Sequence, residues 1–410
     1  MNGFDHTASP DAIADVFART RDQFVLPEGM RYFDGNSLGP LPKAAQMHAY
    51  VAVTHEWGQG LIRSWHDAQW NTLPRRVGDR IATLIGAEPG EVVACDSTSV
   101  NLFKVLCAAA RLRRGRTRII TDAESFPTDL YIAAQVAKLF DMTVTSVPAA
   151  QIPQALGNDV AIVLLNHVDY RSAQVHSLET HTRAAHDAGA LMVCDLSHSA
   201  GAMRCDLNLH RVDFAVGCGY KYLNGGPGAP AFLYAARRHH ADCEQPLAGW
   251  FGHAQPFDFQ ETYVPAPGIE RFLCGTNPVL ALSILERSLQ AFDGISLDAL
   301  RARSLQLTGL FIEQAHARLS RHGFEVASPA QPEVRGSHVS LRHPNGYAVM
   351  QELARQQMIG DFRMPDFMRF GFAPLFNSEA DVTALVDAID NIMVQSLWDR
   401  PEHLQRRAFT

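Results

Sequence analysis

The chain has 410 residues, of which 47% are hydrophobic and 19% are charged, and its formal net charge is −7. One hydrophobic core rarely organises a chain of this length, so we expect a large domain and a smaller one. The negative charge and the lack of Lys and Arg runs argue against a nucleic-acid partner. The apolar stretches are shorter than the roughly 20 residues that span a bilayer, and the N-terminus does not resemble a signal peptide. We therefore expect a cytoplasmic protein without a membrane or nucleic-acid partner.

Cysteine and histidine give no indication of a metal centre. The seven cysteines include no C-x-x-C pair, and Cys95, Cys194 and Cys218 lie in apolar runs where a small hydrophobic residue would pack. The eighteen histidines include no H-E-x-x-H motif, and His181 and His186 are spaced too far apart to share a helical face. We therefore expect reduced core cysteines and no metal.

The first part of the chain is predicted to be mainly helical. A short helix is expected at 11–21, turns at 32–42, and helical spacing of apolar residues continues over 46–86. Farther along, short β-branched runs alternate with amphipathic helical segments. The predicted strands are 118–121, 143–147, 160–166, 190–195 and 214–218, and the helices between them are 128–140 and 177–189. This alternation is typical of a mostly parallel sheet with helices on its faces.

The pattern changes after the helical segment 279–292. Longer helices follow with only a few strands, among them 337–342 and the segment 368–378. We place a second, smaller domain there, with a boundary near residue 295. The sequence shows no internal repeat and no low-complexity linker that would sharpen this boundary.

Several polar side chains follow directly on predicted strands. Asp195 ends one strand, Tyr220 and Lys221 follow the next, and Asp129 begins an earlier helix. In open α/β sheets, ligands bind beyond the carboxyl ends of the strands, so we expect these side chains to face one cavity. A lysine removed from bulk water can form an imine with an aldehyde. A carboxylate such as Asp195 can hold a pyridine nitrogen protonated, which makes the ring an electron sink.

Each of these positions also has a common structural explanation. An acid that ends an apolar strand often binds Mg²⁺ or caps a helix, and a lysine at a strand end is weak evidence of catalysis. A nucleotide site would require a P-loop, but the sequence has no G-x-x-x-x-G-K-[ST] motif. Thr98 and Ser99 begin a helical pattern and suit a phosphate, although hydroxyls there are usually plain N-caps. The combination of lysine, aspartate and phosphate cradle favours pyridoxal 5'-phosphate (PLP).

Eight motifs, in order, give the chain a resemblance to the kynureninase family over nearly its whole length. They are YFDGNSLGPLP (32–42), DSTSVNLFK (96–104), ESFPTD (124–129), CDLSHSAGA (194–202), GCGYKYLNGGPG (217–228), AGWFGH (248–253), GTNP (275–278) and MRFGFAPLFNS (368–378). The resemblance implies the α/β fold of the fold-type-I PLP-dependent enzymes. We accordingly expect a large PLP-binding domain at 46–295 with a mostly parallel seven-stranded sheet, a smaller α+β domain at 296–410, and an N-terminal segment, 1–45, that packs with the smaller domain.

The resemblance also assigns a role to each residue of the predicted site. Lys221 would bind PLP as a Schiff base, with Asp195 as partner of the pyridinium nitrogen and His198 near the phenolic oxygen. Phe126 would stack on the ring. The other cofactor-binding residues that it implies are Thr98, Ser99, Pro127, Thr128, Asp129, Ser172, Tyr220, Trp250 and Thr276, and the implied catalytic residues are Lys221, Tyr220 and Asp195.

For the substrate, the resemblance implies an arginine clamp and a subunit interface. Arg369 offers a bidentate fork for the α-carboxylate, and Asn36 and Trp65 are the other implied substrate contacts. Trp250 and Thr276 would reach in from a second subunit, so we expect a homodimer. Trp65 and Thr276 lie where the family sets the preference between kynurenine and its 3-hydroxy form, and their sizes indicate the kynurenine-preferring bacterial type.

The resulting hypothesis is a PLP-dependent hydrolase of tryptophan degradation. It would cleave the Cβ–Cγ bond of L-kynurenine, or of its 3-hydroxy form, to anthranilate, or 3-hydroxyanthranilate, and L-alanine, with Tyr220 or Lys221 moving protons. A cysteine desulfurase or aminotransferase shares the lysine, aspartate and cradle, but a desulfurase needs a reactive cysteine on a mobile loop. A non-catalytic binding protein has no need of Lys221, Asp195 and Arg369 together.

Overall fold

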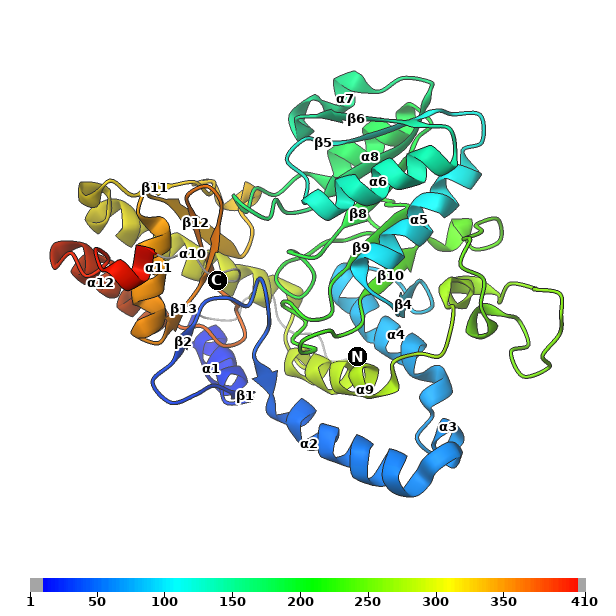
Figure 1. Cartoon of the computed structure of the whole chain (residues 1–410), viewed down its shortest axis with the longest axis horizontal. Coiled ribbons are helices and arrows are strands. Elements are labelled where there is room, and N and C mark those ends of the chain that lie inside the picture. The colour runs from blue at the N-terminus through cyan, green and yellow to red at the C-terminus, as the bar shows by residue number, and fades with distance from the viewer. Residues whose placement is uncertain (1–9, 405–410) are drawn as a thin grey trace.

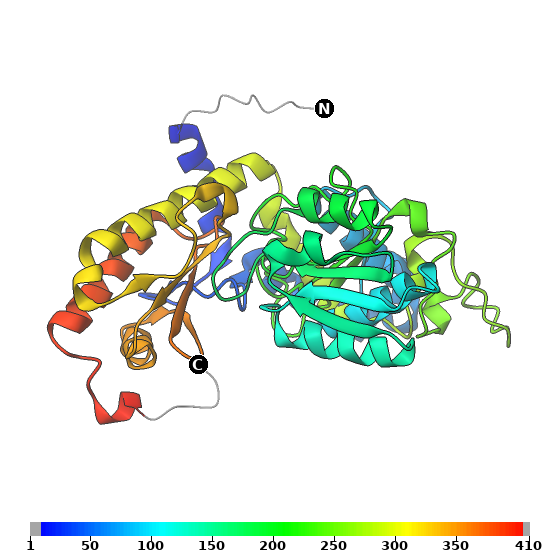
Figure 2. The ribbon, with the colours of Figure 1, turned by 90° about the horizontal axis from the view of Figure 1, so that it is seen from above.

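The computed structural model describes residues 10–404 and divides them between two lobes (Figure 1). The larger lobe contains a seven-stranded sheet and the smaller lobe a four-stranded sheet. Figure 2 shows the two lobes side by side. Within residues 10–404, no helix combines the length and the apolar character that crossing a bilayer requires.

The sheet of the larger lobe is mostly parallel, as predicted. Its strands lie in the order β4-β10-β9-β8-β7-β5-β6. β5 to β9 run parallel to their neighbours in that group, whereas β10 is antiparallel to both β9 and β4. The bounds are β4 Val92–Ala94, β5 Arg118–Asp122, β6 Thr143–Val147, β7 Val160–Asn166, β8 Leu191–Asp195, β9 Phe214–Gly217 and β10 Phe232–Ala235.

Helices cover both faces of this sheet because successive side chains of a strand point to opposite sides. In β7, Ile162 and Leu164 belong to the hydrophobic cluster that includes α5 and α6. Val163 and Leu165 belong to the cluster on the other face, with α4, α8 and α9. A strand buried on both faces is a continuous apolar run, which explains the sequence VAIVLLN. The helices are α4 Leu73–Ile85, α5 Thr98–Leu112, α6 Pro127–Leu139, α7 Ile152–Ala155, α8 Leu178–Asp187 and α9 Val279–Ser288.

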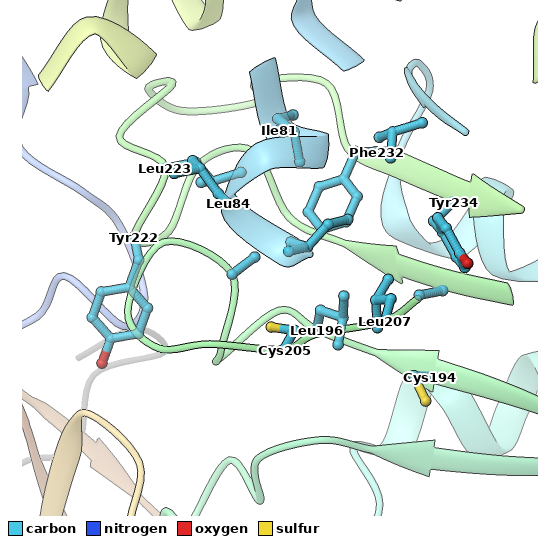
Figure 3. Packing of buried hydrophobic residues seen from close by; sticks show 14 of the residues in the cluster. Ile81, Leu84, Cys194, Leu196, Cys205, Leu207, Tyr222, Leu223, Phe232 and Tyr234 are labelled. Carbon is cyan, nitrogen blue, oxygen red and sulfur yellow. The ribbon is translucent and has the colours of Figure 1, made fainter. Parts of the chain in front are cut away.

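One glycine in this core makes room for an aromatic ring. Figure 3 shows Phe232 packed beside Ile81 and Leu84 of α4. Phe232 of β10 is paired with Gly217 of β9, and a Cβ atom at Gly217 would lie 2.4 Å from Cζ of the ring. Any side chain at this position therefore displaces the ring of Phe232.

The smaller lobe is an antiparallel sheet packed against three helices. The strand order is β11-β12-β15-β14, and a separate hydrophobic cluster that includes Phe311, Val339 and Phe370 fills the space beneath the helices. This is the smaller α+β unit that the fold prediction describes. The bounds are α10 Leu297–Arg318, β11 Glu325–Val326, β12 His338–Arg342, α11 Gly346–Arg355, β14 Asp361–Arg363, β15 Phe367–Gly371, α12 Glu379–Val394 and α13 Pro401–Leu404.

The N-terminal segment contacts the smaller lobe. Arg21, the last residue of α1 (Pro10–Arg21), forms an ion pair with Asp381 of α12. The hydroxyl of Thr20 donates to the carbonyl of Leu375 at 2.7 Å. The strands here are β1 Phe24–Val25, which pairs with β3 Leu41–Pro42, and β2 Arg31–Tyr32, which pairs with β13 Met358–Ile359. Residues 1–9 lie outside the described residues, and the domain boundaries near 45 and 295 stay predictions.

The continuous helical pattern predicted over 46–86 is interrupted in the structure. α2 (Lys43–Val51) continues as a π-helix over Ala52–Gly60, and short turns and α3 (Ser64–Asp67) precede α4. Leu61 has a φ of 50°, which breaks the helix directly after Gly60. The strands β4 and β10 are absent from the prediction because three or four residues carry too little periodicity.

We predict that Gly217→Ala destabilises the protein by about 1–3 kcal/mol, because the added methyl group overpacks a filled core at Phe232. Gly309→Ala is the matched control. It lies inside α10, its Cβ would have 3.6 Å to the nearest atom, and the better helix propensity of Ala adds up to about 1 kcal/mol. Urea unfolding measures both. A Gly217→Ala midpoint equal to that of the natural sequence contradicts this view of the core.

Candidate active site

A cavity of about 200 Å³ lies at the carboxyl ends of the parallel strands. The strand ends and two helix N-termini converge on it, as expected for an open α/β sheet. The cavity brings together nine residues of the predicted site, which are Thr98, Ser99, Phe126, Thr128, Asp129, Asp195, His198, Tyr220 and Lys221.

The fold places each of these side chains for a local reason. Asp195 is the last residue of β8, and Lys221 lies in the turn that follows β9. Thr98 begins α5, whose N-cap Ser97 accepts a hydrogen bond from the amide of Val100. Asp129 lies in the first turn of α6. Pro127, another predicted residue, begins that helix beside the cavity without lining it.

Lys221 is the only lysine at this cavity. The sequence contains four lysines, all within the described part of the chain. Lys104 is completely buried in an ion pair with Asp96, and the remaining two, Lys43 and Lys138, are exposed. Nζ of Lys221 lies 2.8 Å from Nε2 of His198. An amine in this position is the group that an aldehyde cofactor requires.

His198 is neutral beside this amine. Burial and, next, the positive charge of Lys221 hold the pKa of His198 well below its usual range. A neutral imidazole nitrogen accepts a hydrogen bond from the lysine without competing for its proton. The imidazole of His198 therefore orients the amine.

Two buried carboxyl groups face the same cavity. Asp195 accepts a hydrogen bond from the amide of Ser197 at 2.6 Å, and Asp129 accepts one from the side chain of Asn166 at 2.8 Å. Burial and the nearby charge of Asp195 raise the pKa of Asp129 well above its usual value. The charge of Asp195 disfavours a second negative charge on Asp129, and a cationic ring nitrogen would relieve this repulsion. The pair fits the pyridinium of PLP.

The N-terminus of α5 forms a cradle of hydroxyl groups. Thr98 and Ser99 line the cavity, and the hydroxyl of Thr98 lies 3.2 Å from the thiol of Cys218. That thiol also donates to Ser197 at 3.2 Å. The start of a helix binds phosphate through its free backbone amides and its dipole, and hydroxyl groups there add further donors. The cradle therefore fits the phosphate of PLP.

Two aromatic residues of the prediction border the cavity. Burial, and next the neighbouring Cys218, raise the pKa of Tyr220, so its phenol stays protonated at neutral pH. Phe126 is 41% exposed, and its ring meets that of Tyr170 edge-on at a centroid distance of 5.2 Å. Phe126 thus has one face available to a ligand in the cavity.

Five residues that line the cavity are missing from the sequence prediction, namely Asn166, Val168, Tyr170, Ser197 and Cys218, whereas the predicted Ser172 lies elsewhere. Asn166 ends β7, is paired with Asp195 in the sheet and holds Asp129. Asn166 could have been identified from the sequence because it stands at the end of a predicted strand. Ser172 instead donates to Asp169 at 2.6 Å and lines a different cavity, beyond the loop that follows β7.

Within one chain, the structure does not bring Trp65, Trp250 or Thr276 to this cavity. Trp65 and Trp250 line a separate apolar groove together with Phe257. The rings of both tryptophans pack against Phe251, at centroid distances of 5.6 and 4.1 Å. Thr276 is exposed.

Arg369 is buried, and its guanidinium is already engaged. It lies on β15, with 2% of its surface exposed, and binds both oxygens of Asp361. The guanidinium of Arg369, which was expected to be free for the substrate α-carboxylate, therefore binds Asp361 in the structure. Asn36 is completely buried beside Gly371, and neither polar atom of its side chain has a hydrogen-bond partner among the described residues.

Asp34 is a further acid close to Asp361 and Arg369. Burial and the charge of Asp361 raise the pKa of Asp34 to about 8. A carboxyl whose pKa is raised by folding stabilises the protein at low pH, and that contribution is lost as pH rises from about 4 to about 8.

We predict that Asp34→Asn improves stability relative to the natural sequence as the pH increases, because the amide resembles the protonated acid and does not titrate. The difference in Tm, variant minus natural sequence, should be larger at pH 8.5 than at pH 5. Thermal unfolding at both pH values measures it. A difference that shrinks as the pH rises would show that Asp34 is ionised in the folded protein.

Comparisons with known proteins define first the class of protein. Cysteine desulfurase from Thermococcus onnurineus NA1, in its apo form, superposes with a TM-score of 0.79 at 18% identity, covering 92% of this chain and 98% of that one. A structure of C-DES with glycine covalently linked to the PLP cofactor gives a TM-score of 0.81 at 18% identity, with 90% and 99% covered. The fold is that of the fold-type-I PLP enzymes.

Sequence comparisons then identify the family. A family model described as the kynureninase C-terminal domain matches residues 300–389. Kynureninase from Burkholderia pseudomallei strain 1106a is 45% identical over 404 residues, which cover 97% of each chain. The chain belongs to the kynureninase family of PLP-dependent hydrolases.

Proposed function

We propose that this protein hydrolyses L-kynurenine to anthranilate and L-alanine with PLP bound covalently through Lys221. The observation that carries this assignment is the place of Lys221 as the only lysine at a cavity with two buried carboxyls and a hydroxyl cradle. Asp195 would hold the ring nitrogen, Thr98 and Ser99 the phosphate, and Phe126 one face of the ring. Asn166 joins this set in place of Ser172.

The chemistry follows from the groups that surround the amine. Bound PLP supplies an electron sink for the electron pairs released at Cα and Cβ of the substrate. Lys221, once the substrate amine has taken its place, accepts the Cα proton, and neutral His198 at 2.8 Å keeps it oriented. Tyr220 stays protonated, so its phenol can donate a proton to Cβ after water has added to the γ-carbonyl and the Cβ–Cγ bond has broken with release of anthranilate.

The cysteines argue against a desulfurase. All seven are free, and six of them are buried. The seventh, Cys274, donates its thiol proton to the carbonyl of Leu247 at 2.9 Å, and burial raises its pKa. A nucleophilic cysteine needs a lowered pKa and access to the substrate. None of the seven, all within the described residues, is exposed as a nucleophile on a mobile loop would be.

We expect the protein with PLP to release anthranilate from L-kynurenine, followed by its fluorescence, and to release no sulfide from L-cysteine. Lys221→Ala should lower kcat/KM by at least about a thousandfold and abolish the visible absorption band of the bound cofactor. Lys138→Ala, at an exposed lysine, should leave both unchanged. A natural protein without anthranilate release would remove the substrate assignment, and a band that persists in Lys221→Ala would move the cofactor to another lysine.

We also propose a homodimer in which Trp250 and Thr276 complete the site of the neighbouring subunit. Exposed apolar side chains near the Trp65–Trp250 groove support this proposal, with Ile62 77% and Phe259 78% exposed. Trp65 and Thr276 would then favour kynurenine over its 3-hydroxy form, as the family resemblance implies.

This proposal predicts complementation between two inactive variants. In a mixed dimer of Lys221→Ala and Trp250→Ala subunits, one of the two sites has both residues intact. Random exchange makes half of the dimers mixed, so the mixture should recover about one quarter of natural activity. Activity is measured after subunits are mixed, denatured together and refolded. A mixture no more active than its components places Trp250 and Lys221 of one site in the same subunit.

A further inference from the structure

The guanidinium of Arg369 has little capacity left for a ligand. Its Nε donates to Oδ1 of Asp361 at 2.7 Å, and Nη2 donates to the other oxygen of the same carboxylate. Nη2 also donates to the hydroxyl of Ser37 at 3.1 Å, and Nη1 donates to the carbonyl of Tyr170. A guanidinium has five N–H donors, so these contacts leave one. In this arrangement Arg369 alone cannot present two donors to a carboxylate.

Arg363 is a second cation on the same acid. Its Nη2 lies 2.8 Å from Oδ2 of Asp361, and its Nη1 donates to the carbonyl of Phe362 at 3.0 Å. Its side chain is 36% exposed, whereas that of Arg369 is 2% exposed. Among the described residues, these contacts use two of its five donors. Arg363 therefore keeps donors for a ligand and has room to turn toward one.

The charge of Arg363 affects the pKa of His198, which lines the active-site cavity. His198, whose low pKa is due first to burial and next to Lys221, is lowered further by the charges of Arg369 and Arg363. Arg369 in turn bonds to the backbone of Tyr170, whose side chain lines the cavity. The two arginines and the reactive amine thus belong to one electrostatic neighbourhood.

The cluster formed by Arg363, Arg369 and Asp361 contains one excess positive charge. Burial opposes the ionisation of Asp361, but Arg369 outweighs it and the pKa falls to about 2. The other titratable neighbours are neutral at pH 7, since the pKa of Asp34 is raised to about 8 and burial lowers that of His338 to about 3. Two arginines and one carboxylate sum to a single positive charge. A largely buried excess charge is costly unless an anion pairs with it.

We propose that Arg363 is a specificity-determining residue for the α-carboxylate of the substrate, which it binds together with the free donor of Arg369. Asp361 is the positioning residue that holds both arginines. The inference rests on the proposed function, because it adds a residue to the same substrate site. An amino-acid carboxylate supplies the one negative charge that the cluster lacks, and the unused donors of Arg363 are available to it while the pairing with Asp361 is kept.

The experiment compares L-kynurenine with its α-carboxamide in the holoenzyme of Arg363→Gln. For L-kynurenine, KM should rise by about tenfold or more, as expected when a charge-assisted hydrogen bond is lost. For the carboxamide, KM should change little, so the preference for acid over amide collapses. The PLP dissociation constant and the visible spectrum should stay at natural values, which a general loss of structure would disturb.

Arg342→Gln is the matched control. Arg342 lies on β12 of the same sheet, is 43% exposed and pairs with Asp366 at 2.9 Å, away from the cavity. It should leave both KM values unchanged, and Arg363→Lys, which keeps the charge, should fall between Arg363→Gln and the natural protein. An unchanged acid-to-amide preference in Arg363→Gln and Arg363→Lys overturns the proposal, whereas natural protein inactive on L-kynurenine overturns the proposed function itself.

Discussion

The whole site depends on keeping one amine reactive inside a cavity that also holds acids. Nζ of Lys221 lies 2.8 Å from an imidazole that burial keeps neutral, and the two carboxyls that face the cavity belong to Asp129 and Asp195. Because Asp129 is pushed toward its protonated form, the cavity is less negative than its composition indicates. This balance of charge leaves Asp195 available to pair with a ring nitrogen and Lys221 available to react with an aldehyde.

The irregular N-terminal motif connects this site to the smaller lobe. The amide of Gly39 donates to the carbonyl of Tyr220 at 2.8 Å. A Cβ atom at Gly39 would lie 2.4 Å from the carbonyl oxygen of Lys221, so only glycine fits against the turn that carries the lysine. Ser37, two residues earlier, donates to Asp361 and accepts from Arg369. One short segment thus contacts both the turn that carries Lys221 and the buried Arg369.

Much of this architecture was predictable from the sequence because it depends on local patterns. The run VAIVLLN and the strand that ends at Asp195 identify a sheet buried on both faces, and the polar residues that end the strands identify its ligand-binding edge. The eight motifs then indicated PLP as the ligand at that edge. These local patterns explain why nine predicted residues meet at one cavity.

Other features depend on contacts that periodicity does not encode. The short strands β4 and β10 are defined by their partners in the sheet. The pairing of Arg369 with Asp361 joins adjacent strands in a hairpin. The sequence alone does not reveal that the guanidinium expected to bind the substrate is bound to this carboxylate. Ser172 and Asn166 lie on one loop and one strand end, and only the folded chain shows which of them faces the cavity.

The proposed function requires that the amine at position 221 bonds to the cofactor. Borohydride reduction of the holoenzyme fixes that bond, and peptide mass spectrometry then locates the added mass among the four lysines of the chain. We expect a single pyridoxyl adduct, on Lys221. An adduct on Lys43, Lys104 or Lys138 instead, or none after reduction, would contradict it.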